Sequence, residues 1–453
     1  MTKPLKNWWG RLLFQDSGIV PSKRLLIGYA IFSICLIVLG RVTDIAWSFI
    51  FLLNMSVILA SFIDLFFIPR KRMIGMKRVL PEELERGINY KVNIELSNHS
   101  EHDLFYTIVD GLPASFERPF PVSGTCKMHA ATTITYETSA SKRGKYVIKK
   151  LYVRYTSTLG LWQKQMTIDD MHTVRVIPDL SETKHYLQDM QRYLLHEGTV
   201  IRKFQSGAGE FAQIRNYVVG DDPRMINWRQ TAKLREVMTN EYEPEHGKYM
   251  TLLLDCGRMM GAELEEVNRL EKTLEAVITV AAAALEKGDY VSVIAFSKEV
   301  QVFVPAGKGM AHLQTILQAV YNVKAEPVEA NYAHALSYVE LHQKKRSLLL
   351  LFSDIRTFLY EESALHYLQR IRQRHVFFMI GIEDSVIKDT IRKFPFGERE
   401  AMHKSIAQQQ MLFKKREMAK WEKQGLLMIE AKKENLAATA ISIYFDFVNR
   451  NVI

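Results

Sequence analysis

The chain has 453 residues, of which 47% are apolar, and a formal net charge of +10. This length allows roughly two to four domains, and the apolar content excludes a wholly disordered chain. Three cysteines, Cys35, Cys126 and Cys256, lie far apart without CxxC spacing, which argues against a disulfide framework or a thiolate zinc site and favours a reducing compartment. The positive charge indicates nucleic acid or an anionic membrane as a partner, and its place along the chain decides between them.

Two long apolar runs lie near the N-terminus. Residues 25–40 and 45–63 contain no charged side chain, and only the polar link RVTD separates them. At about 1.5 Å per residue the second run approaches the roughly 30 Å hydrocarbon core of a bilayer. We therefore expect a transmembrane helical hairpin, with helices at about 25–41 and 45–67, in an N-terminal segment of residues 1–72.

A signal peptide and a buried core hairpin are the alternatives for these runs. A signal peptide would lack the second run and would carry a small-residue cleavage site, which the sequence does not show. Basic residues flank the pair on both sides: Lys3, Lys6, Arg11, Lys23 and Arg24 before it, and Arg70, Lys71, Arg72, Lys77 and Arg78 after it. The positive-inside rule then predicts a multi-pass protein of the inner (cytoplasmic) membrane, with both termini and the soluble domains in the cytoplasm. Much of the positive charge then lies where it can contact lipid headgroups, so it is weaker evidence for binding of nucleic acid.

Residues 73–178 follow a period of two. From Tyr90 to Leu96 apolar and polar side chains alternate, as on a half-buried antiparallel strand. Further short β-rich runs follow at regular spacing with turn residues between them, which is typical of a small sandwich. We predict a β-sandwich domain over residues 73–178, with Glu82 and Glu83 on a solvated face.

Strands and helices alternate from residue 248 to the end. The apolar run before Asp255 is typical of a strand buried on both faces, and an apolar stripe from Leu264 to Ile278 predicts a helix after it. The same alternation continues to a last strand, GLLMIEA, and a C-terminal helix. We predict an α/β doubly wound domain over 248–453, joined to the β-sandwich by a linker at 179–247. Residues 400–423 are predicted to form an exposed basic helix whose charges are solvated.

Two acids follow buried strands of this domain, Asp255 after MTLLL and Asp354 after LLLLFS. Ligands collect at the carboxyl ends of strands in open α/β sheets, and two carboxylates there can hold a divalent cation. The alternative is that both acids cap the following loops and helices.

This arrangement resembles a von Willebrand factor A domain, in which an Asp-x-Ser-x-Ser motif, a threonine and a later aspartate surround Mg²⁺. Here the first motif reads DCGRM, so Asp255 is present but Gly257 and Met259 stand at the serine positions. Asp354 matches the later acid, and EPVEANYAHAL offers no convincing threonine. We expect no cofactor, with Mg²⁺ held by Asp255 and Asp354 as the alternative.

The stretch GEFAQIRNYVVGDDPRMINWRQ resembles the signature of the bacterial family called domain of unknown function 58. The matching positions are Glu210, Phe211, Ile214, Arg215, Tyr217, Gly220, Asp221, Asp222, Arg224, Ile226 and Trp228. The resemblance extends over nearly the whole chain, including the paired membrane helices and an RGKY turn at 143–146. Asn227 departs from the pattern, which frequently has an acid there.

The physical chemistry of the signature favours a structural role. Asp221 and Asp222 before Pro223 are expected to cap a helix that begins near Pro223, and Trp228 to anchor that helix on the sheet.

Ion pairs are expected in the same segment, because Arg215 and Arg224 lie near these acids and Glu210 in the sequence. We therefore favour a lock that joins the β domain to the sheet. A partner-docking surface and a catalytic site that binds metal and phosphate are the alternatives.

Enzyme motifs are missing from the sequence. It contains no GxxxxGK loop, GxSxG elbow, HExxH or GxGxxG, and its 13 histidines show no metal-ligand spacing. Nucleic-acid binding would need a basic stripe with exposed aromatic residues, and the one candidate, KKREMAKWEK, is diluted by Glu417 and Glu422.

The family resemblance implies a protein that accompanies MoxR-type AAA+ ATPases. We expect a membrane-anchored, non-enzymatic adaptor that takes part in the assembly or maturation of other proteins. Its von Willebrand A-like domain would receive the ATPase on the surface around Asp255 and Asp354. A metal-dependent hydrolase that uses Asp221 and Asp222, or Asp255 and Asp354, is the alternative, as is a nucleic-acid-binding membrane protein.

Overall fold

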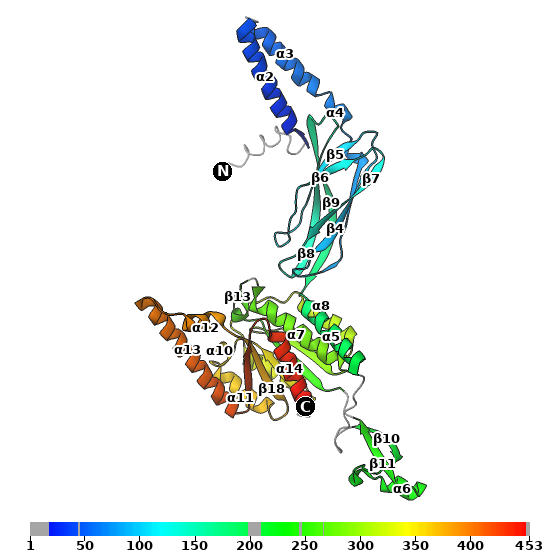
Figure 1. Ribbon diagram of the computed structural model, residues 1–453, viewed down its shortest axis with the longest axis vertical. Coiled ribbons are helices and arrows are strands. Elements are labelled where there is room, and N and C mark those ends of the chain that lie inside the picture. The colour runs from blue at the N-terminus through cyan, green and yellow to red at the C-terminus, as the bar shows by residue number, and fades with distance from the viewer. Residues whose placement is uncertain (1–17, 44–45, 198–209, 244–246, 266, 450–453) are drawn as a thin grey trace. The chain divides into compact units, whose positions relative to one another are not determined.

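The computed structural model describes residues 18–43, 46–197, 210–243, 247–265 and 267–449. The chain divides into two compact units, Met1–Ile177 and Pro178–Ile453. The first unit holds the N-terminal helices and a β domain, and the second holds a larger α/β domain (Figure 1).

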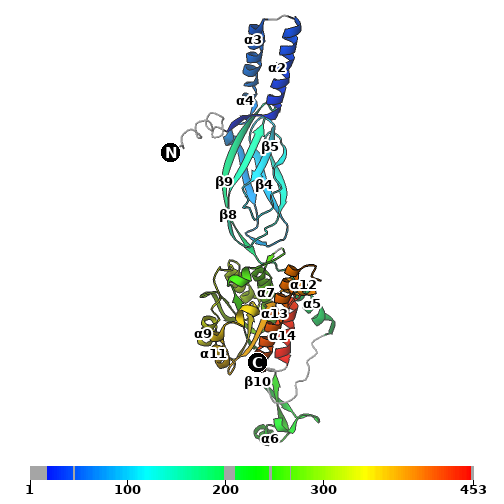
Figure 2. The same ribbon diagram turned by 90° about the vertical axis from the view of Figure 1, so that its left-hand side faces the viewer.

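The N-terminal helices form a hairpin in the first unit. Helix α2 spans Lys23–Thr43, α3 spans Trp47–Ser61, and the single turn α4 spans Asp64–Phe67. Helices α2 and α3 lie side by side (Figure 2). Two helical stretches, Lys23–Thr43 and Trp47–Met73, are long and apolar enough to cross a membrane, and their most apolar parts are 0% and 17% buried; the second includes α3 and α4. A core helix of a soluble domain would bury this surface, so the exposure argues against a buried core hairpin.

The β domain consists of two sheets around one core. One sheet has the order β1-β9-β8-β5-β6, with β3 beside β9, and the other has the order β2-β4-β7. Their bounds are Ile19–Pro21 (β1), Ile74–Val79 (β2), Glu83–Glu85 (β3), Tyr90–Asn98 (β4), Leu104–Asp110 (β5), Val122–Cys126 (β6), Ala130–Thr138 (β7), Gly144–Thr156 (β8) and Trp162–Ile177 (β9). Val92, Ile94 and Leu96 of β4 are fully buried, in agreement with the alternation in the sequence.

A buried ion pair links the two sheets. Arg78 of β2 donates from Nε to the carboxylate of Asp110 on β5 at 2.8 Å, and both side chains are 0% exposed. Tyr136 of β7 donates to the same carboxylate at 2.6 Å, and burial together with the Asp110 charge raises the pKa of Tyr136. The prediction that Arg78 contributes to the membrane-facing charge is therefore wrong, because its guanidinium lies in the core.

The second unit is built on a six-stranded sheet of order β16-β15-β12-β17-β18-β19. All neighbours are parallel except β15 and β16. Its strands are Tyr249–Asp255 (β12), Tyr290–Phe296 (β15), Val300–Gly307 (β16), Ser347–Phe352 (β17), Val376–Ile382 (β18) and Leu427–Ala431 (β19). The continuous apolar strands in the centre are buried on both faces, as predicted.

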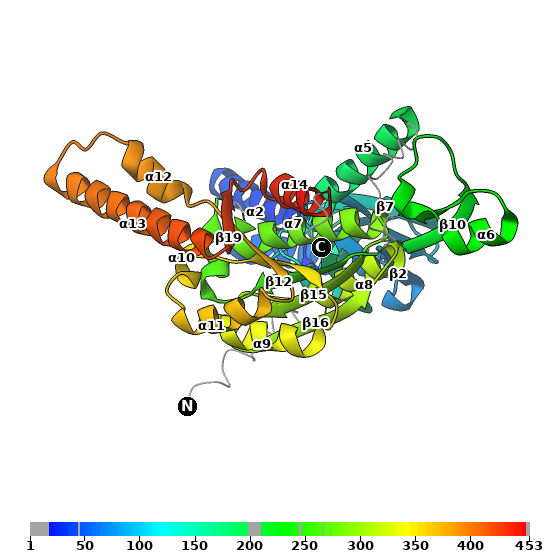
Figure 3. The ribbon, with the colours of Figure 1, turned by 90° about the horizontal axis from the view of Figure 1, so that it is seen from below.

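Helices cover both faces of this sheet (Figure 3). One face carries α5 (Ser181–Glu197), α7 (Arg269–Glu286), α8 (Met310–Val320) and α14 (Leu436–Asn449). The other face carries α9 (Tyr332–His342), α10 (Ile355–Phe358), α11 (Glu362–Ile371) and the C-terminal part of α13 (Glu398–Lys423), with α12 (Ser385–Arg392) beside α13. Because α5 packs on α7, the stretch predicted as a linker contributes a helix to this domain.

Two predicted helices differ from those observed. Leu264 and Val267 belong to the short strands β13 (Glu263–Leu264) and β14 (Val267–Asn268), and α7 begins only at Arg269 because Asn268 caps it. Helix α13 is only partly exposed, since Lys414 and Trp421 are 8% and 5% exposed.

The family-signature segment forms a small structural unit of two strands and a short helix. Strand β10 (Glu210–Asn216) pairs antiparallel with β11 (Met238–Glu243). A 3-10 turn, η2 (Pro223–Met225), and a two-turn helix, α6 (Trp228–Leu234), connect them. We call residues 210–243 the signature module.

Candidate functional site

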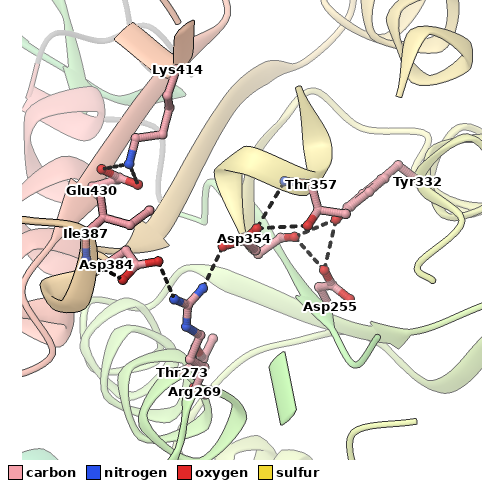
Figure 4. A network of polar contacts seen from close by, with 11 residues as sticks. Asp255, Arg269, Thr273, Tyr332, Asp354, Thr357, Asp384, Ile387, Lys414 and Glu430 are labelled. Carbon is pink, nitrogen blue, oxygen red and sulfur yellow. Dashed lines mark hydrogen bonds and ion pairs between the residues drawn. The ribbon is translucent and has the colours of Figure 1, made fainter. Parts of the chain in front are cut away.

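Polar side chains gather at the carboxyl edge of the central strands (Figure 4). Asp255 is the last residue of β12, and Asp354 follows the neighbouring strand β17, so the two predicted acids do lie at adjacent strand ends. They are only 2% and 8% exposed. With Arg269, Tyr332 and Ser353 they form what we call the sheet-edge cluster.

The Asp255 carboxylate is held entirely by neutral donors. Its Oδ1 accepts from the backbone N–H of Gly257 at 2.7 Å, and its Oδ2 accepts from the hydroxyls of Ser353 and Tyr332, the latter at 3.1 Å. Burial raises the pKa of Asp255, and these hydrogen bonds oppose that rise. Burial and the Asp255 charge raise the pKa of Tyr332 well above its ordinary value, so its hydroxyl is a permanent donor.

Asp354 is held by a cation and by a helix terminus. Its Oδ1 accepts from Arg269 Nη1 at 2.6 Å, while its Oδ2 accepts from the N–H and the hydroxyl of Thr357 at 3.0 and 2.8 Å. Arg269 also lies 3.6 Å from Asp384, which caps α12. Asp354 therefore caps α10, which is the alternative that the sequence left open for it.

The residues around this pair do not fit Mg²⁺. The Arg269 guanidinium already supplies a positive charge beside Asp354, and both carboxylate oxygens of Asp354 are engaged. A Cβ at Gly257 would lie 3.1 Å from Asp255 Oδ1 and 3.0 Å from the backbone N of Ala330, so a serine in its place would crowd the carboxylate. Among the described residues, no group of three or more His, Cys, Asp or Glu side chains is arranged to hold a metal.

A small cavity adjoins Asp354. Its volume is about 20 Å³, and Asp384, Lys414 and Glu430 contribute to its lining. Lys414 donates to both oxygens of Glu430 at 2.7 and 2.8 Å. A space of this size holds about one water molecule and is far below the several hundred Å³ of a typical ligand pocket.

In the signature module an ion pair closes the turn after β10. Arg215 donates from both terminal nitrogens to Asp221 at 2.8 Å, one of the pairings that the sequence leaves open, and the hydrogen bond to Asp221 raises the pKa of Arg215. Asp221 also accepts from the N–H of Val218 at 3.0 Å, and the Tyr217 hydroxyl donates to its backbone carbonyl at 3.2 Å. Gly220 has φ of +111°, a conformation that other residues rarely adopt.

The caps of the module differ from those predicted. Asp222 accepts from the N–H of Arg224, but it caps only the turn η2. The helix α6 starts at Trp228, and Asn227 caps it by accepting from the N–H of Gln230 at 3.1 Å. The same asparagine donates to Asn240 of β11 at 2.9 Å. Asn227, the position that departs from the family pattern, therefore ties the helix to the strand. Glu210 begins β10, and its side chain lies outside the described residues.

Trp228 does not anchor the module, in contrast to the prediction. Its side chain is 69% exposed, and Val218 and Val219 are 60% and 97% exposed. The basic residues Arg224, Arg229, Lys233 and Arg235 are exposed on the same short segment. A lock would bury these side chains, so the exposure favours the docking alternative.

Comparison with known proteins gives a family for part of the chain. Residues 213–389 match the family model described as protein of unknown function DUF58. An uncharacterized protein of Bacillus subtilis (strain 168), YeaD, is 23% identical over 282 residues, which are 60% of this chain and 68% of that protein.

Solved structures give only distant likenesses. The conserved hypothetical protein BatB of Bacteroides thetaiotaomicron is matched over its full length by 45% of this chain, with 13% identity and a TM-score of 0.31. The PapD-like domain 7 of human CEP192 is matched over 89% of its length by 24% of this chain, with 16% identity and a TM-score of 0.18. Scores this low support no functional argument. The family match itself confirms the resemblance predicted from the signature: residues 213–389 of this chain are a DUF58 region.

Proposed function

We propose that the chain is a membrane-anchored, non-enzymatic adaptor whose signature module docks a protein partner. The observation that carries this proposal is the exposure of Trp228 with Val218 and Val219. Tryptophan and arginine are among the residue types most enriched where binding energy concentrates in interfaces, and large contiguous apolar patches on a monomer mark interaction sites.

The sheet-edge cluster supports a role without catalysis. Asp255 and Asp354 are buried, and their carboxylate oxygens accept hydrogen bonds from groups of the same domain. Neither carboxylate is therefore free to act as a base or as a metal ligand. Because these carboxylates are buried, a partner that binds at this edge of the sheet would have to contact exposed residues nearby. Arg258, whose side chain is 62% exposed, is one of them. The order of the parallel strands and the helices on both faces are compatible with a von Willebrand A-like domain as the platform.

The partner that the family resemblance implies is a MoxR-type AAA+ ATPase. The surface it offers to this chain is expected to combine acidic and apolar groups, because four exposed bases lie on the same short segment as Trp228 and Val219. The anchor is the α2–α3 hairpin in the inner membrane, with the soluble domains in the cytoplasm.

The test is site-specific photocrosslinking of the full chain in native membranes. A photoreactive residue replaces Val219 in the module, Arg258 near the sheet edge, or Leu341, which is 65% exposed on α9 and serves as the control. The proposal expects an ATPase subunit to be captured from position 219 and not from position 341. Capture from position 258 alone would place the contact at the sheet edge instead, and capture from none of the three would reject a docked ATPase.

A further inference from the structure

We infer that the base of the helical hairpin, together with the adjoining end of the β domain, binds the headgroup of an anionic phospholipid. This inference rests on the proposed membrane anchoring. The site consists of Arg24, Arg70, Lys71 and Lys164 with the apolar side chains of Phe66 and Leu159, and we call it the collar.

The hairpin base is fixed to the β domain by a buried carboxylate. Asp64, at the start of α4, is 1% exposed, and its Oδ2 accepts from the N–H groups of Leu161 and Trp162 at 2.8 and 2.9 Å. The Trp162 indole donates to the hydroxyl of Ser61 at 3.2 Å, and its ring stacks on Phe62 with centroids 5.1 Å apart. The loop between β8 and β9 therefore lies level with the helix ends, where headgroups lie if the hairpin spans a bilayer.

Apolar side chains at this level point away from the protein. Phe66 is 86% exposed, Ile63 57%, and Leu159 of the β8–β9 loop 59%. They come from two segments far apart in the sequence, joined through Asp64. Aromatic and apolar residues at the ends of membrane helices lie in the interfacial region of the bilayer, where headgroups and the first methylenes cover them.

Cations converge on the same level. Lys164 of β9 donates from Nζ to the carbonyl oxygens of Ile68 and Pro69 at 3.0 and 3.3 Å, which fixes its charge beside the hairpin base. Burial, and then the charges of Arg70 and Lys71, lower the pKa of Lys164, so the three cations are close enough to repel one another. Within the described part of the chain, no carboxylate forms an ion pair with any of the three.

Arg24 completes the cluster from the other helix. It lies in the first turn of α2 against the β8–β9 loop, since a Cβ at Gly160 would be 3.2 Å from its Nη1. Helix α2, the segment that follows α4, and the β domain thus each contribute at least one cation. A phosphate placed among them offsets their mutual repulsion.

The exposed Phe66 and Leu159 favour a lipid over a free phosphate ion, because the acyl chains of a bound lipid cover them. Each basic residue near an anionic membrane surface strengthens its attraction several-fold. A lipid held by residues from the helices and from the β domain also fixes the β domain against the membrane.

The test uses the full chain extracted in detergent and titrated with phosphatidylglycerol or phosphatidylcholine, with bound lipid counted by native mass spectrometry. We expect phosphatidylglycerol to bind about 10-fold or more tightly than phosphatidylcholine. Arg70→Gln with Lys71→Gln, both at exposed positions, should abolish most of this preference. The control pair, Lys142→Gln with Lys145→Gln, removes two exposed charges at the opposite end of β8 and should leave the preference within about twofold.

The possible results test lipid binding by the collar separately from membrane anchoring by the hairpin. Equal affinity for the two lipids, or equal loss with the control pair, overturns the collar while the anchoring stands. Competition by inorganic phosphate at the same concentration as the lipid shows a phosphate site and also overturns it. If the chain stays in the soluble fraction when native membranes are sedimented, the anchoring fails and the collar with it.

Discussion

The sheet-edge cluster and the signature module both place an arginine against an aspartate at a turn, but in different surroundings. The side chains of Arg269 and Asp354 are each 9% exposed, whereas those of Arg215 and Asp221 are 35% and 21% exposed. Removing one partner of a buried pair leaves a charge without water or counterion, while an exposed pair contributes about 0–1 kcal/mol. The first pair therefore maintains the fold, whereas the second contributes little to stability and lies in the module that we propose docks a partner.

The largest effect is expected from Arg269→Met. The variant leaves Asp354 buried beside a hydrophobic side chain, which should lower the free energy of unfolding of the α/β domain by about 3–5 kcal/mol. Hydrogen exchange of the β12 and β17 amides in the full chain measures this loss locally.

A second variant separates lost charge from lost packing. Asp354→Asn on the Arg269→Met background removes the orphaned charge, and asparagine can still accept from Thr357 and cap α10. Most of the stability should return. If the double variant exchanges as fast as Arg269→Met alone, charge pairing is not what holds the cluster together.

Trp228→Ala should weaken binding of the partner and leave the stability of the fold almost unchanged. Because the side chain is 69% exposed, stability should change by less than about 0.5 kcal/mol. Capture of the partner should fall about 30-fold, as for a hot-spot residue that contributes roughly 2 kcal/mol. Binding of purified partner to the full chain in detergent gives both Kd values, and Leu341→Ala is the matched exposed control. An unchanged Kd would place the docking surface elsewhere.

The contrast between the two regions also separates what the sequence could predict from what it could not. Asp255 and Asp354 could be placed at neighbouring strand ends because buried parallel strands appear as continuous apolar runs. The short separation of Arg215 from the neighbouring acids predicts an ion pair, although it does not select Asp221 as the partner. Partners from distant elements left no local signal: Arg269 is 85 residues from Asp354, and Tyr332 is 77 from Asp255.

Trp228 and Arg78 show why residue type alone misleads. A large apolar side chain is usually buried, which predicts that Trp228 anchors its helix on the sheet, but many apolar side chains remain exposed in folded proteins, and Trp228 is one of them. Arg78 follows four other basic residues in the sequence, and this position alone groups it with them. The strand period places its side chain on the inner face of β2, where Asp110 neutralises it.

The contribution of Asp255 to the stability of the folded protein is expected to depend on pH. Its folded-state pKa is raised by burial, so the folded protein binds the proton more tightly than the unfolded chain does. The stability that Asp255 contributes is therefore full below the ordinary aspartate pKa and is lost as pH rises through the raised value. Asp255→Asn should consequently destabilise the protein more at pH 4 than at pH 7, as measured by the shift in Tm. A larger effect at pH 7 would mean that the hydrogen bonds from Ser353, Tyr332 and Gly257 outweigh burial.

Only a small change in stability is expected from Arg215→Ala. Its bidentate pair with Asp221 is partly exposed to solvent, so the free energy of unfolding should fall by no more than about 1 kcal/mol. The pair nevertheless positions the turn, because Asp221 also accepts from the N–H of Val218, beside the exposed Val219. Partner affinity should therefore fall several-fold while Tm barely moves, and Arg215→Lys should not restore it, since an ammonium cannot form both hydrogen bonds. If affinity is unchanged in Arg215→Ala but lost in Trp228→Ala, docking depends on α6 alone and not on the turn that Arg215 closes.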